Sequence, residues 1–315
     1  MQRKMLGNTG IKVSRMCFGT LTVGPLQACL PVERGAAVLA HGIERGVDFF
    51  DTAQLYGTYP YLRRAMEISG RRDIVIASKT YAYTRKVAAQ AVEQARRELN
   101  RDYIDIFMLH EQESIHTLRG HEPALEYLLE QKQRGVIRAV GASMHHIAAV
   151  EGACALGLEV IHPLINLEGL GIVDGGRARM EAALQKARGL GVGVYGMKPL
   201  GGGNLFARAE ECLRYALGLN CLDSVAIGMQ SVEEVDANIE FWRTGTFSPR
   251  NRRALGEKTR RLHIDTWCEG CGACVRRCAQ GALSLSGGKA VCEHQRCLLC
   301  GYCCTVCPAW AIKVV

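Results

Sequence analysis

The sequence predicts an α/β protein, a closed (β/α)8 TIM barrel followed by a small α+β domain. Eight short apolar runs alternate with helical stretches over about 240 residues, which is the size of such a barrel. No glycine-rich fingerprint opens a helix after the first run, so a doubly wound dinucleotide-binding sheet is the less favoured alternative. After Trp242 the composition changes, because ten of the fifteen cysteines lie between Cys268 and Cys307. We therefore expect three parts, namely the barrel over residues 1–242, a basic linker helix over 243–263 and the small domain over 264–315.

The expected barrel strands are short apolar runs with β-branched patterns. They are residues 16–20, 47–53, 73–80, 103–110, 137–143, 159–166, 192–200 and 224–229. The stretches between them have apolar residues at helical spacing. The clearest of these are residues 33–46, 86–100, 123–135 and 232–242. This alternation indicates a parallel sheet whose strands are joined by helices.

Two further stretches of the barrel segment contain glycine patterns. Residues 3–14 include the turn Asn8–Gly10, which predicts a short hairpin that closes the bottom of the barrel. Residues 191–196, GVGVYG, match the G-x-G-x-x-G pattern of nucleotide-binding turns. They overlap the seventh expected strand instead of opening a helix, so we interpret this match as chance.

Composition narrows the class of protein. The 315 residues are 48% apolar and 22% charged, which is ordinary for a globular protein. The N-terminus has no apolar signal-peptide core, and no run of about eighteen apolar residues occurs, so we expect a cytoplasmic protein without a membrane span. In that setting the cysteines indicate metal binding in a reducing compartment rather than disulfides.

The net charge of +8 is concentrated in the linker. Residues 243–263 hold seven Arg or Lys and one Glu, a net charge of +6. The plainer interpretation is a solvated linker helix. The alternative is a docking face for an acidic redox partner such as a ferredoxin or flavodoxin. No role in nucleic-acid binding is expected, because Phe247 is the single aromatic residue there and no binding motif surrounds it.

Residues 264–315 contain an internal repeat with two cysteine runs. Both runs have the spacing C-x2-C-x2-C-x3-C, and each is followed by a short strand-like tail. Iron–sulfur clusters need several thiolates on tight turns, and in proteins with two such runs the fourth cysteine of each run binds the other cluster. The two expected ligand sets are Cys268, Cys271, Cys274 and Cys307, and Cys297, Cys300, Cys303 and Cys278. Paired zinc sites are the alternative, although four ligands per zinc give no reason for the repeated third and fourth cysteines.

The remaining cysteines fall outside this pattern. Cys292 and Cys304 lie within the repeat but not at ligand spacing. The others are interpreted as small buried hydrophobic residues, and they are Cys17, Cys29, Cys154, Cys212 and Cys221.

Four ionisable residues stand at the ends of three successive expected strands. They are Asp51, Tyr56, Lys79 and His110. Each alone has a plain structural explanation: Asp51 could cap a helix, Tyr56 could be a rim residue, Lys79 a surface charge and His110 a core histidine. Active sites of such barrels, however, lie at the C-terminal strand ends, where all four would meet. Carbonyl reduction needs a proton for the oxygen, and Tyr56 is a poor acid unless a cation stabilises its phenolate. Lys79 could supply that cation, Asp51 could keep it ionised, and His110 could orient the carbonyl oxygen.

These residues and their surroundings resemble the aldo-keto reductase family over residues 3–242. The matching stretches are FFDTAQLYG (49–57), ASKT (77–80), MLHE (108–111), YGMKPLGGG (195–203) and SVAIGMQSVEEVDANI (224–239). The resemblance implies that the four residues form a catalytic tetrad and that a nicotinamide cofactor lies across the barrel mouth. Residues 264–315 resemble bacterial ferredoxins with two 4Fe–4S clusters, with Ala279 where that family usually has proline. The whole chain is similar to the aldo-keto reductases that end in a ferredoxin-like domain.

The resemblance also implies which residues contact the nicotinamide cofactor. They are Gly19, Thr20, Ser143, Asn166, Met197, Lys198, Leu200, Gly201, Gly228, Gln230 and Asn238. Three positions depart from the family pattern, since Met144, Asn166 and Met197 stand where an asparagine, a glutamine and a tyrosine are common. Met229 and Gln230 replace the basic residue of NADPH-specific members, which weakens the case for NADPH over NADH, although Lys198 could substitute in part. The glycines at 201–203 either let the backbone approach a pyrophosphate or form a plain flexible turn.

Hydride transfer moves two electrons together, whereas iron–sulfur clusters move them singly. The leading hypothesis is an oxidoreductase for an aldehyde, ketone or related small molecule that uses NADPH or NADH and exchanges electrons with a redox partner through its ferredoxin domain. A flavin could couple the two, but no flavin motif is present. A second hypothesis makes the clusters the sole electron source, and a third makes the barrel a non-catalytic platform of an electron carrier or redox sensor.

The position of the second domain follows from the same resemblance. In aldo-keto reductases the segment after the last barrel helix helps to roof the substrate pocket. We therefore expect one cluster to lie over the barrel mouth, and clusters on the bottom face of the barrel would contradict this.

Overall fold

The computed structural model describes residues 1–256 and 260–314. Eight parallel strands close into a barrel in the order β10-β3-β4-β5-β6-β7-β8-β9. Their bounds are β3 Met16–Gly19, β4 Phe49–Asp51, β5 Val75–Thr80, β6 Ile104–Gln112, β7 Ile137–Met144, β8 Val160–Pro163, β9 Gly193–Met197 and β10 Ser224–Gly228. All eight strands fall within or next to the runs predicted from the sequence, so the barrel prediction is confirmed.

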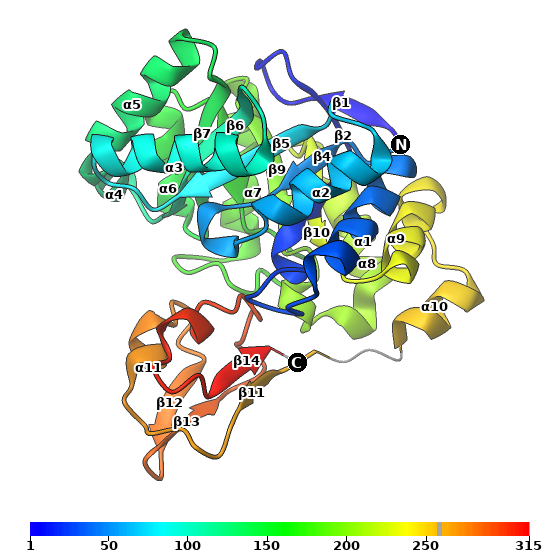
Figure 1. Cartoon of the computed structure of the whole chain (residues 1–315), viewed down its shortest axis with the longest axis vertical. Coiled ribbons are helices and arrows are strands. Elements are labelled where there is room, and N and C mark those ends of the chain that lie inside the picture. Colours follow the sequence, from blue (N-terminus) through cyan, green and yellow to red (C-terminus); the bar gives the residue numbers. More distant parts are fainter. Residues whose placement is uncertain (257–259, 315) are drawn as a thin grey trace.

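Helices surround the barrel on its outside (Figure 1). They are α1 Val32–Glu44, α2 Tyr59–Ser69, α3 Arg85–Leu99, α4 Ile115–Gly120, α5 Glu122–Gln133, α6 Ile147–Ala155, α7 Arg177–Gly189, α8 Ala209–Gly218 and α9 Val232–Thr244. Short 3-10 turns lie at η1 Thr20–Thr22, η2 Gln54–Tyr56, η3 Gly201–Gly203, η4 Phe206–Arg208 and η5 Cys304–Val306. Helix α3 shows how the local sequence sets the bounds, because the Thr84 hydroxyl accepts a hydrogen bond from the Val87 amide at its start. The left-handed Asn100 ends it.

The N-terminal hairpin closes the bottom of the barrel, as predicted. Strands β1 (Arg3–Met5) and β2 (Lys12–Ser14) pair antiparallel. Leu6 and Ile11 are buried against the interior side chains of the barrel strands, among them Phe49. This packing leaves the opposite end of the barrel, where the strands end, as the open mouth.

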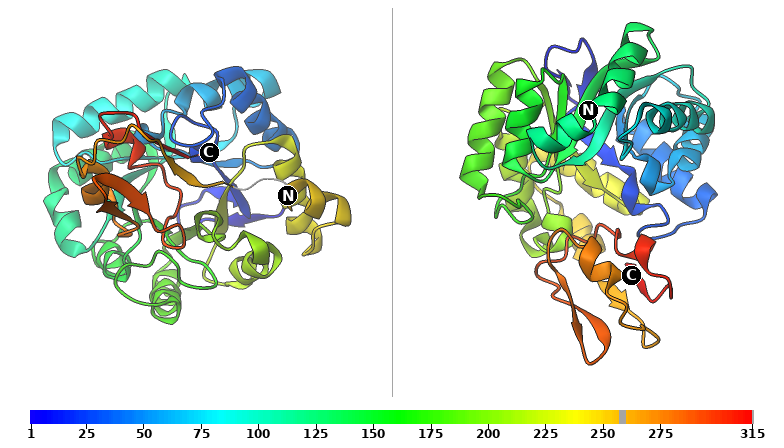
Figure 2. Two further views of the ribbon diagram at one scale, coloured as in Figure 1. Left: turned by 90° about the horizontal axis from the view of Figure 1, so that it is seen from below. Right: turned by 90° about the vertical axis from the view of Figure 1, so that its left-hand side faces the viewer.

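The cysteine-rich segment lies at that open mouth, on the far side of the barrel from the hairpin (Figures 1 and 2). It contains β11 Leu262–Ile264, α11 Ala273–Arg277, β12 Leu283–Ser286, β13 Lys289–Cys292 and β14 Ile312–Val314. Strand β11 pairs antiparallel with β14, and β12 pairs antiparallel with β13. The two predicted strand-like tails are therefore present as β12 and β14.

At two points of the junction between this segment and the barrel, main chain packs directly on main chain. Gly202 has a φ of +70°, and a Cβ atom there would lie 2.1 Å from the Leu298 carbonyl oxygen. Gly301 has a φ of +75°, and its Cβ atom would lie 2.2 Å from the Leu26 carbonyl oxygen. Both distances are shorter than any real contact, so only glycine fits at these positions.

The basic linker is helical in part. Helix α10 covers Pro249–Gly256, whereas the prediction of a helix over 243–263 also includes residues 257–259, which lie outside the described residues. Arg252 forms an ion pair of 2.7 Å with Glu210, and this contact ties the linker to the barrel. None of the helices in the described part of the chain combines the length and the apolar content needed to cross a membrane.

Candidate active site

The structure brings the four residues predicted for the tetrad together at the barrel mouth. Asp51 ends β4, Tyr56 follows in η2, and Lys79 and His110 lie near the ends of β5 and β6. The Lys79 Nζ atom donates hydrogen bonds to both Asp51 carboxylate oxygens, at 2.7 and 2.8 Å, and to the Thr52 carbonyl at 2.7 Å. It lies 4.9 Å from the centre of the Tyr56 ring. The rings of Tyr56 and His110 meet edge to face, with centroids 5.6 Å apart.

Burial shifts the pKa values of the tetrad side chains. Desolvation raises the pKa of the Tyr56 phenol well above 10, with a further rise from the Asp51 charge and a partial offset from a hydrogen bond with Tyr302. Desolvation also lowers the pKa of Lys79, although the Asp51 carboxylate opposes that shift. The sequence led us to expect that Lys79 would lower the pKa of Tyr56. In this structure Tyr56 is instead a neutral phenol, because burial raises its pKa and the nearby Asp51 charge adds to that rise.

His110 is a neutral imidazole in this environment. Desolvation and then the Lys79 charge hold its pKa well below 6.5. A neutral imidazole can donate a hydrogen bond to a carbonyl oxygen without giving up a proton. This agrees with an orienting role and leaves Tyr56 as the proton donor of the pair.

Two residues that sequence reasoning missed hold Asp51 from the far side of the barrel. The Tyr195 hydroxyl donates a hydrogen bond of 2.8 Å to Asp51 Oδ1. The His162 ring stacks on Tyr195, with centroids 3.9 Å apart, and its Nε2 lies 3.6 Å from Asp51 Oδ1. Polar residues in the middle of β8 and β9 were the available signal, since a buried strand carries few of them.

A third missed residue, Tyr302, comes from the cysteine-rich segment. Its hydroxyl lies 3.2 Å from His110 Nε2, and its ring meets the His110 ring edge to face. The Arg277 guanidinium lies 4.8 Å from the centre of the Tyr302 ring. Tyr302 is therefore part of the same cluster as Tyr56 and His110, although it is 192 residues from His110 in the chain.

Strand β6 is irregular next to His110. Its pairing with β7 shifts register between Leu109 and Gln112, and Glu111 has a φ of +49°, a conformation that is unusual for a residue with a side chain. Tyr81, which stacks on His110, donates a hydrogen bond to the Glu111 carboxylate. Within the described part of the chain, His110 Nδ1 and Gln112 Oε1 are buried without a hydrogen-bond partner. Such atoms are costly unless a ligand or water satisfies them.

These residues face a polar cavity that opens on the His110 side of the mouth. Its lining includes Tyr81, His110, Glu111, Gln112, His145 and Arg277. The cavity combines carboxylate, amide and imidazole groups, so it suits a polar ligand.

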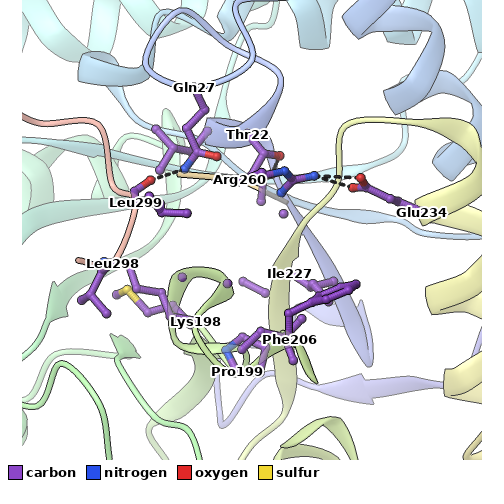
Figure 3. Close-up of a pocket in the computed structure, with 18 of the residues that line it drawn as sticks. Thr22, Gln27, Lys198, Pro199, Phe206, Ile227, Glu234, Arg260, Leu298 and Leu299 are labelled. Carbon is purple, nitrogen blue, oxygen red and sulfur yellow. Dashed lines mark hydrogen bonds and ion pairs between the residues drawn. The ribbon is translucent and has the colours of Figure 1, made fainter. Parts of the chain in front are cut away.

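A second cavity, called the long cavity here because residues from Tyr56 to Asn238 line it, lies on the Tyr56 side. Figure 3 shows part of its lining. Six of the residues predicted to contact a nicotinamide cofactor line it, and they are Gly19, Met197, Lys198, Leu200, Gly228 and Asn238. Asp51 and Tyr56 lie at one end of it. The cysteine-rich segment forms part of its wall through Leu298, Leu299 and Cys300.

The other five predicted cofactor residues do not line this cavity; they are Thr20, Ser143, Asn166, Gly201 and Gln230. The Ser143 hydroxyl accepts a hydrogen bond from the Glu111 amide. The Asn166 amide is bonded to the Leu170 main chain through both its oxygen and its nitrogen. Ser143 and Asn166 are therefore engaged in holding loops in this structure.

Arg260, from the basic linker, also lines the long cavity near Asn238. Its Nη2 atom lies 2.8 Å from each Glu234 carboxylate oxygen (Figure 3). Met229 and Gln230 supply no cation, and Arg260 brings one to this end of the cavity from outside the barrel. No local pattern connects Arg260 to Asn238, because the fold of the linker places them together.

The predicted cluster ligands of the first set share one cavity. Cys268, Cys271, Cys274 and Cys307, the first predicted set, line one small cavity of the cysteine-rich segment. The Cys268 and Cys307 sulfur atoms accept hydrogen bonds from the Ala290 and Ala311 amides, at 3.4 and 3.3 Å. In the second predicted set, the Cys278 sulfur atom accepts a hydrogen bond of 3.4 Å from the Ala282 amide. All fifteen cysteines are free thiols.

The thiols of these two sets are not closely grouped. Across residues 1–256 and 260–314, no group of three or more histidine, cysteine, aspartate or glutamate side chains is arranged to hold a metal ion. The shared cavity and the amide donors suit sulfur ligands of a cluster, which commonly accept main-chain hydrogen bonds.

Comparison with known proteins covers the barrel. A family model described as the aldo/keto reductase family matches residues 15–211. L-galactose dehydrogenase of Arabidopsis thaliana is 22% identical over 76% of this chain and 87% of its own length. Aldo-keto reductase YhdN of Bacillus subtilis (strain 168) is 26% identical over 53% of this chain and 54% of its own.

The same fold is found among solved structures. The holo form of aldo-keto reductase AKR11C1 from Bacillus halodurans superposes with a TM-score of 0.66 and 22% identity. The match covers 82% of this chain and 96% of that one. The residues matched by the family model end at 211, before the cysteine-rich segment begins.

Proposed function

Because the chain belongs to the aldo/keto reductase family, we propose that it is an oxidoreductase that reduces a carbonyl group of a small molecule, or oxidises the alcohol in reverse. The observation that carries this proposal is the convergence of Tyr56 and His110 on one point, with the Lys79–Asp51 pair behind Tyr56. In the extended proposal, electrons are also exchanged through the cysteine-rich segment, with a redox protein such as a ferredoxin or flavodoxin.

In the proposed reaction, each residue of the tetrad has a separate task. Tyr56 donates the proton to the carbonyl oxygen as negative charge develops there. His110 donates a hydrogen bond that orients this oxygen. Lys79, held by Asp51, lies near the Tyr56 ring and stabilises the phenolate once the proton has left. The carbonyl oxygen must therefore lie within hydrogen-bond distance of both Tyr56 and His110.

We place the nicotinamide cofactor in the long cavity. The cavity runs from Tyr56 to Asn238, and six of the predicted contact residues line it. When bound, the cofactor would supply the hydride. Arg260 stands at the Asn238 end, where a 2′-phosphate would need a cation, and this favours NADPH over NADH.

Replacing Arg260 by alanine is expected to weaken NADPH binding by about 10- to 100-fold, because a charge-assisted hydrogen bond is lost and Glu234 then repels the phosphate. Binding of NADH should change by less than about threefold. Anaerobic calorimetry with both nucleotides measures this. Arg252→Ala is the matched control, since Arg252 is a linker arginine paired with a barrel glutamate but lies outside the cavity. Equal losses for both nucleotides would contradict this role of Arg260.

We also propose that the cysteine-rich segment, residues 264–315, holds two 4Fe–4S clusters. One would be bound by Cys268, Cys271, Cys274 and Cys307, and the other by Cys297, Cys300, Cys303 and Cys278. Such clusters would supply or accept single electrons. The support is the repeated spacing, the cavity shared by the first set and the amide hydrogen bonds to the sulfur atoms.

Replacing Cys274 by alanine is expected to lower the iron and acid-labile sulfide content of anaerobically prepared protein by about half or more, because one cluster loses a ligand. Cys292→Ala is the matched control, because Cys292 lies in the same segment but outside the ligand pattern. Its iron content should equal that of the unchanged protein. If metal analysis finds zinc instead of iron and sulfide, the paired zinc sites are correct.

Two observations favour a second candidate function, a reductase fed by the clusters alone. Ser143 and Asn166, expected at the nicotinamide, are engaged elsewhere, and Leu298 and Leu299 of the cysteine-rich segment form part of the wall of the long cavity. In that case neither NADPH nor NADH would bind in the calorimetric experiment, whereas tight binding of either excludes it.

A further inference from the structure

Tyr302 lies on a loop that is hydrogen-bonded to two separate segments of the barrel through the residues just before Tyr302. The Gln27 side-chain amide donates a hydrogen bond of 2.5 Å to the Leu299 carbonyl oxygen, and the Asn204 side-chain amide donates one of 2.5 Å to the Cys297 carbonyl oxygen. Gly301 lies against the Leu26 main chain. The loop thus enters the barrel mouth in a defined position, and the Tyr302 side chain is only 6% exposed.

The Tyr302 hydroxyl occupies the point on which the tetrad converges. It lies 3.2 Å from His110 Nε2, and the Tyr302 side chain is buried in the same cluster as Tyr56. A carbonyl oxygen that receives a proton from Tyr56 and a hydrogen bond from His110 must contact the same two groups. Two oxygen atoms cannot share this volume in a close-packed site.

We propose that Tyr302 is a positioning residue whose hydroxyl stands in for the oxygen of the substrate, so that a substrate binds only when Tyr302 withdraws. This proposal rests on the tetrad of the proposed function. It gives the cysteine-rich segment a direct part in controlling the barrel site, through a residue located between Cys300 and Cys303.

The two cavities are consistent with this arrangement. Tyr56 lines the long cavity and His110 lines the polar one, and Tyr302 contacts both residues. Tyr302 itself lines neither cavity, because it is buried against the residues that do. Withdrawal of Tyr302 would join the two cavities at the point where Tyr56 and His110 meet.

The phenol side chain of Tyr302 suggests which small molecules can test this proposal. The side chain of Tyr302 is a phenol, so p-cresol reproduces it as a free molecule, and toluene reproduces its ring without the hydroxyl. Removing the side chain by Tyr302→Ala should open a site for p-cresol. Calorimetric titration of the full chain with both compounds requires no turnover.

In the Tyr302→Ala variant we expect p-cresol to bind about tenfold more tightly than toluene, because its hydroxyl satisfies Tyr56 and His110. The unchanged protein should bind neither compound at this site. Adding Tyr56→Phe to Tyr302→Ala should reduce the preference for p-cresol. Equal binding of the two compounds by Tyr302→Ala, or equal binding of p-cresol by the unchanged protein, would overturn the proposal, since a residue that merely fills space predicts no preference.

A second variant covers the case in which Tyr302→Ala does not fold. Tyr302→Phe keeps the ring but loses the hydroxyl, so benzaldehyde should bind to it about tenfold more tightly than to the unchanged protein. Toluene should show no such gain. Benzaldehyde affinities that are equal in the two proteins, including undetectable binding in both, would refute the stand-in role. These tests measure binding of small molecules and not turnover. The Tyr302 proposal can therefore fail while loss of turnover in Tyr56→Phe still supports the proposed function, and the proposed function can fail while the binding results support the role of Tyr302.

Discussion

Phenylalanine at position 56 is expected to lower carbonyl-reducing turnover by about 100- to 10,000-fold, the usual contribution of a positioned general acid. The ring and its edge-to-face contact with His110 remain, and only the proton donor is lost. Burial holds the pKa of Tyr56 well above 10, so in the unchanged protein the proton is present throughout the neutral range. Anaerobic turnover of a panel of small aldehydes measures the effect.

Tyr59→Phe is the matched control for this variant. Tyr59 is a buried tyrosine three residues further along, and its hydroxyl forms a hydrogen bond of 2.6 Å with Ser78 away from the barrel mouth. Its loss should cost about 1 kcal/mol of unfolding free energy and leave turnover within about threefold. If Tyr56→Phe retains full activity, the barrel is a platform for the cysteine-rich segment rather than a catalyst.

Lys79→Met is expected to lower the free energy of unfolding by about 3–5 kcal/mol, because it leaves the Asp51 carboxylate buried without its partner. Both members of this pair are almost fully buried, so water cannot take the place of the lysine. Urea unfolding followed by circular dichroism measures the change.

Two further variants test the origin of that loss. Lys132→Met removes a lysine from a more exposed pair with Glu159 and should cost about 0–1 kcal/mol. The double variant Asp51→Asn with Lys79→Met should recover much of the stability, since no charge is then left buried. A double variant as unstable as the single one would show that packing, and not charge, accounts for the loss.

The barrel and the position of the tetrad were predictable because they follow from local sequence. Each strand is a short apolar run, and parallel strands in a barrel bring their C-terminal ends to one face. Asp51, Lys79 and His110 each lie at such an end, so the pattern alone predicts that they meet. The hairpin over residues 3–14 followed in the same way from its turn.

The remaining parts of the site depend on contacts that no local pattern records. Tyr302 and Arg260 reach the barrel mouth only because the segments after Trp242 fold back over it. The pKa of Tyr56 also differed from expectation, since the sequence shows that a lysine is near but not that burial is complete and that the Asp51 charge adds to the rise. The engagement of Ser143 with the Glu111 amide likewise follows from the bulge in β6.

The main-chain contacts at Gly202 and Gly301 limit how the two parts of this chain could be exchanged with those of relatives. At both positions the nearest atom to an added Cβ is a main-chain carbonyl oxygen, which cannot change rotamer to admit a larger residue. A barrel with any larger residue at position 202, or a cysteine-rich segment with one at 301, would force the two main chains apart at that point. Recombination between relatives therefore preserves the docked arrangement only when both glycines are inherited as a pair.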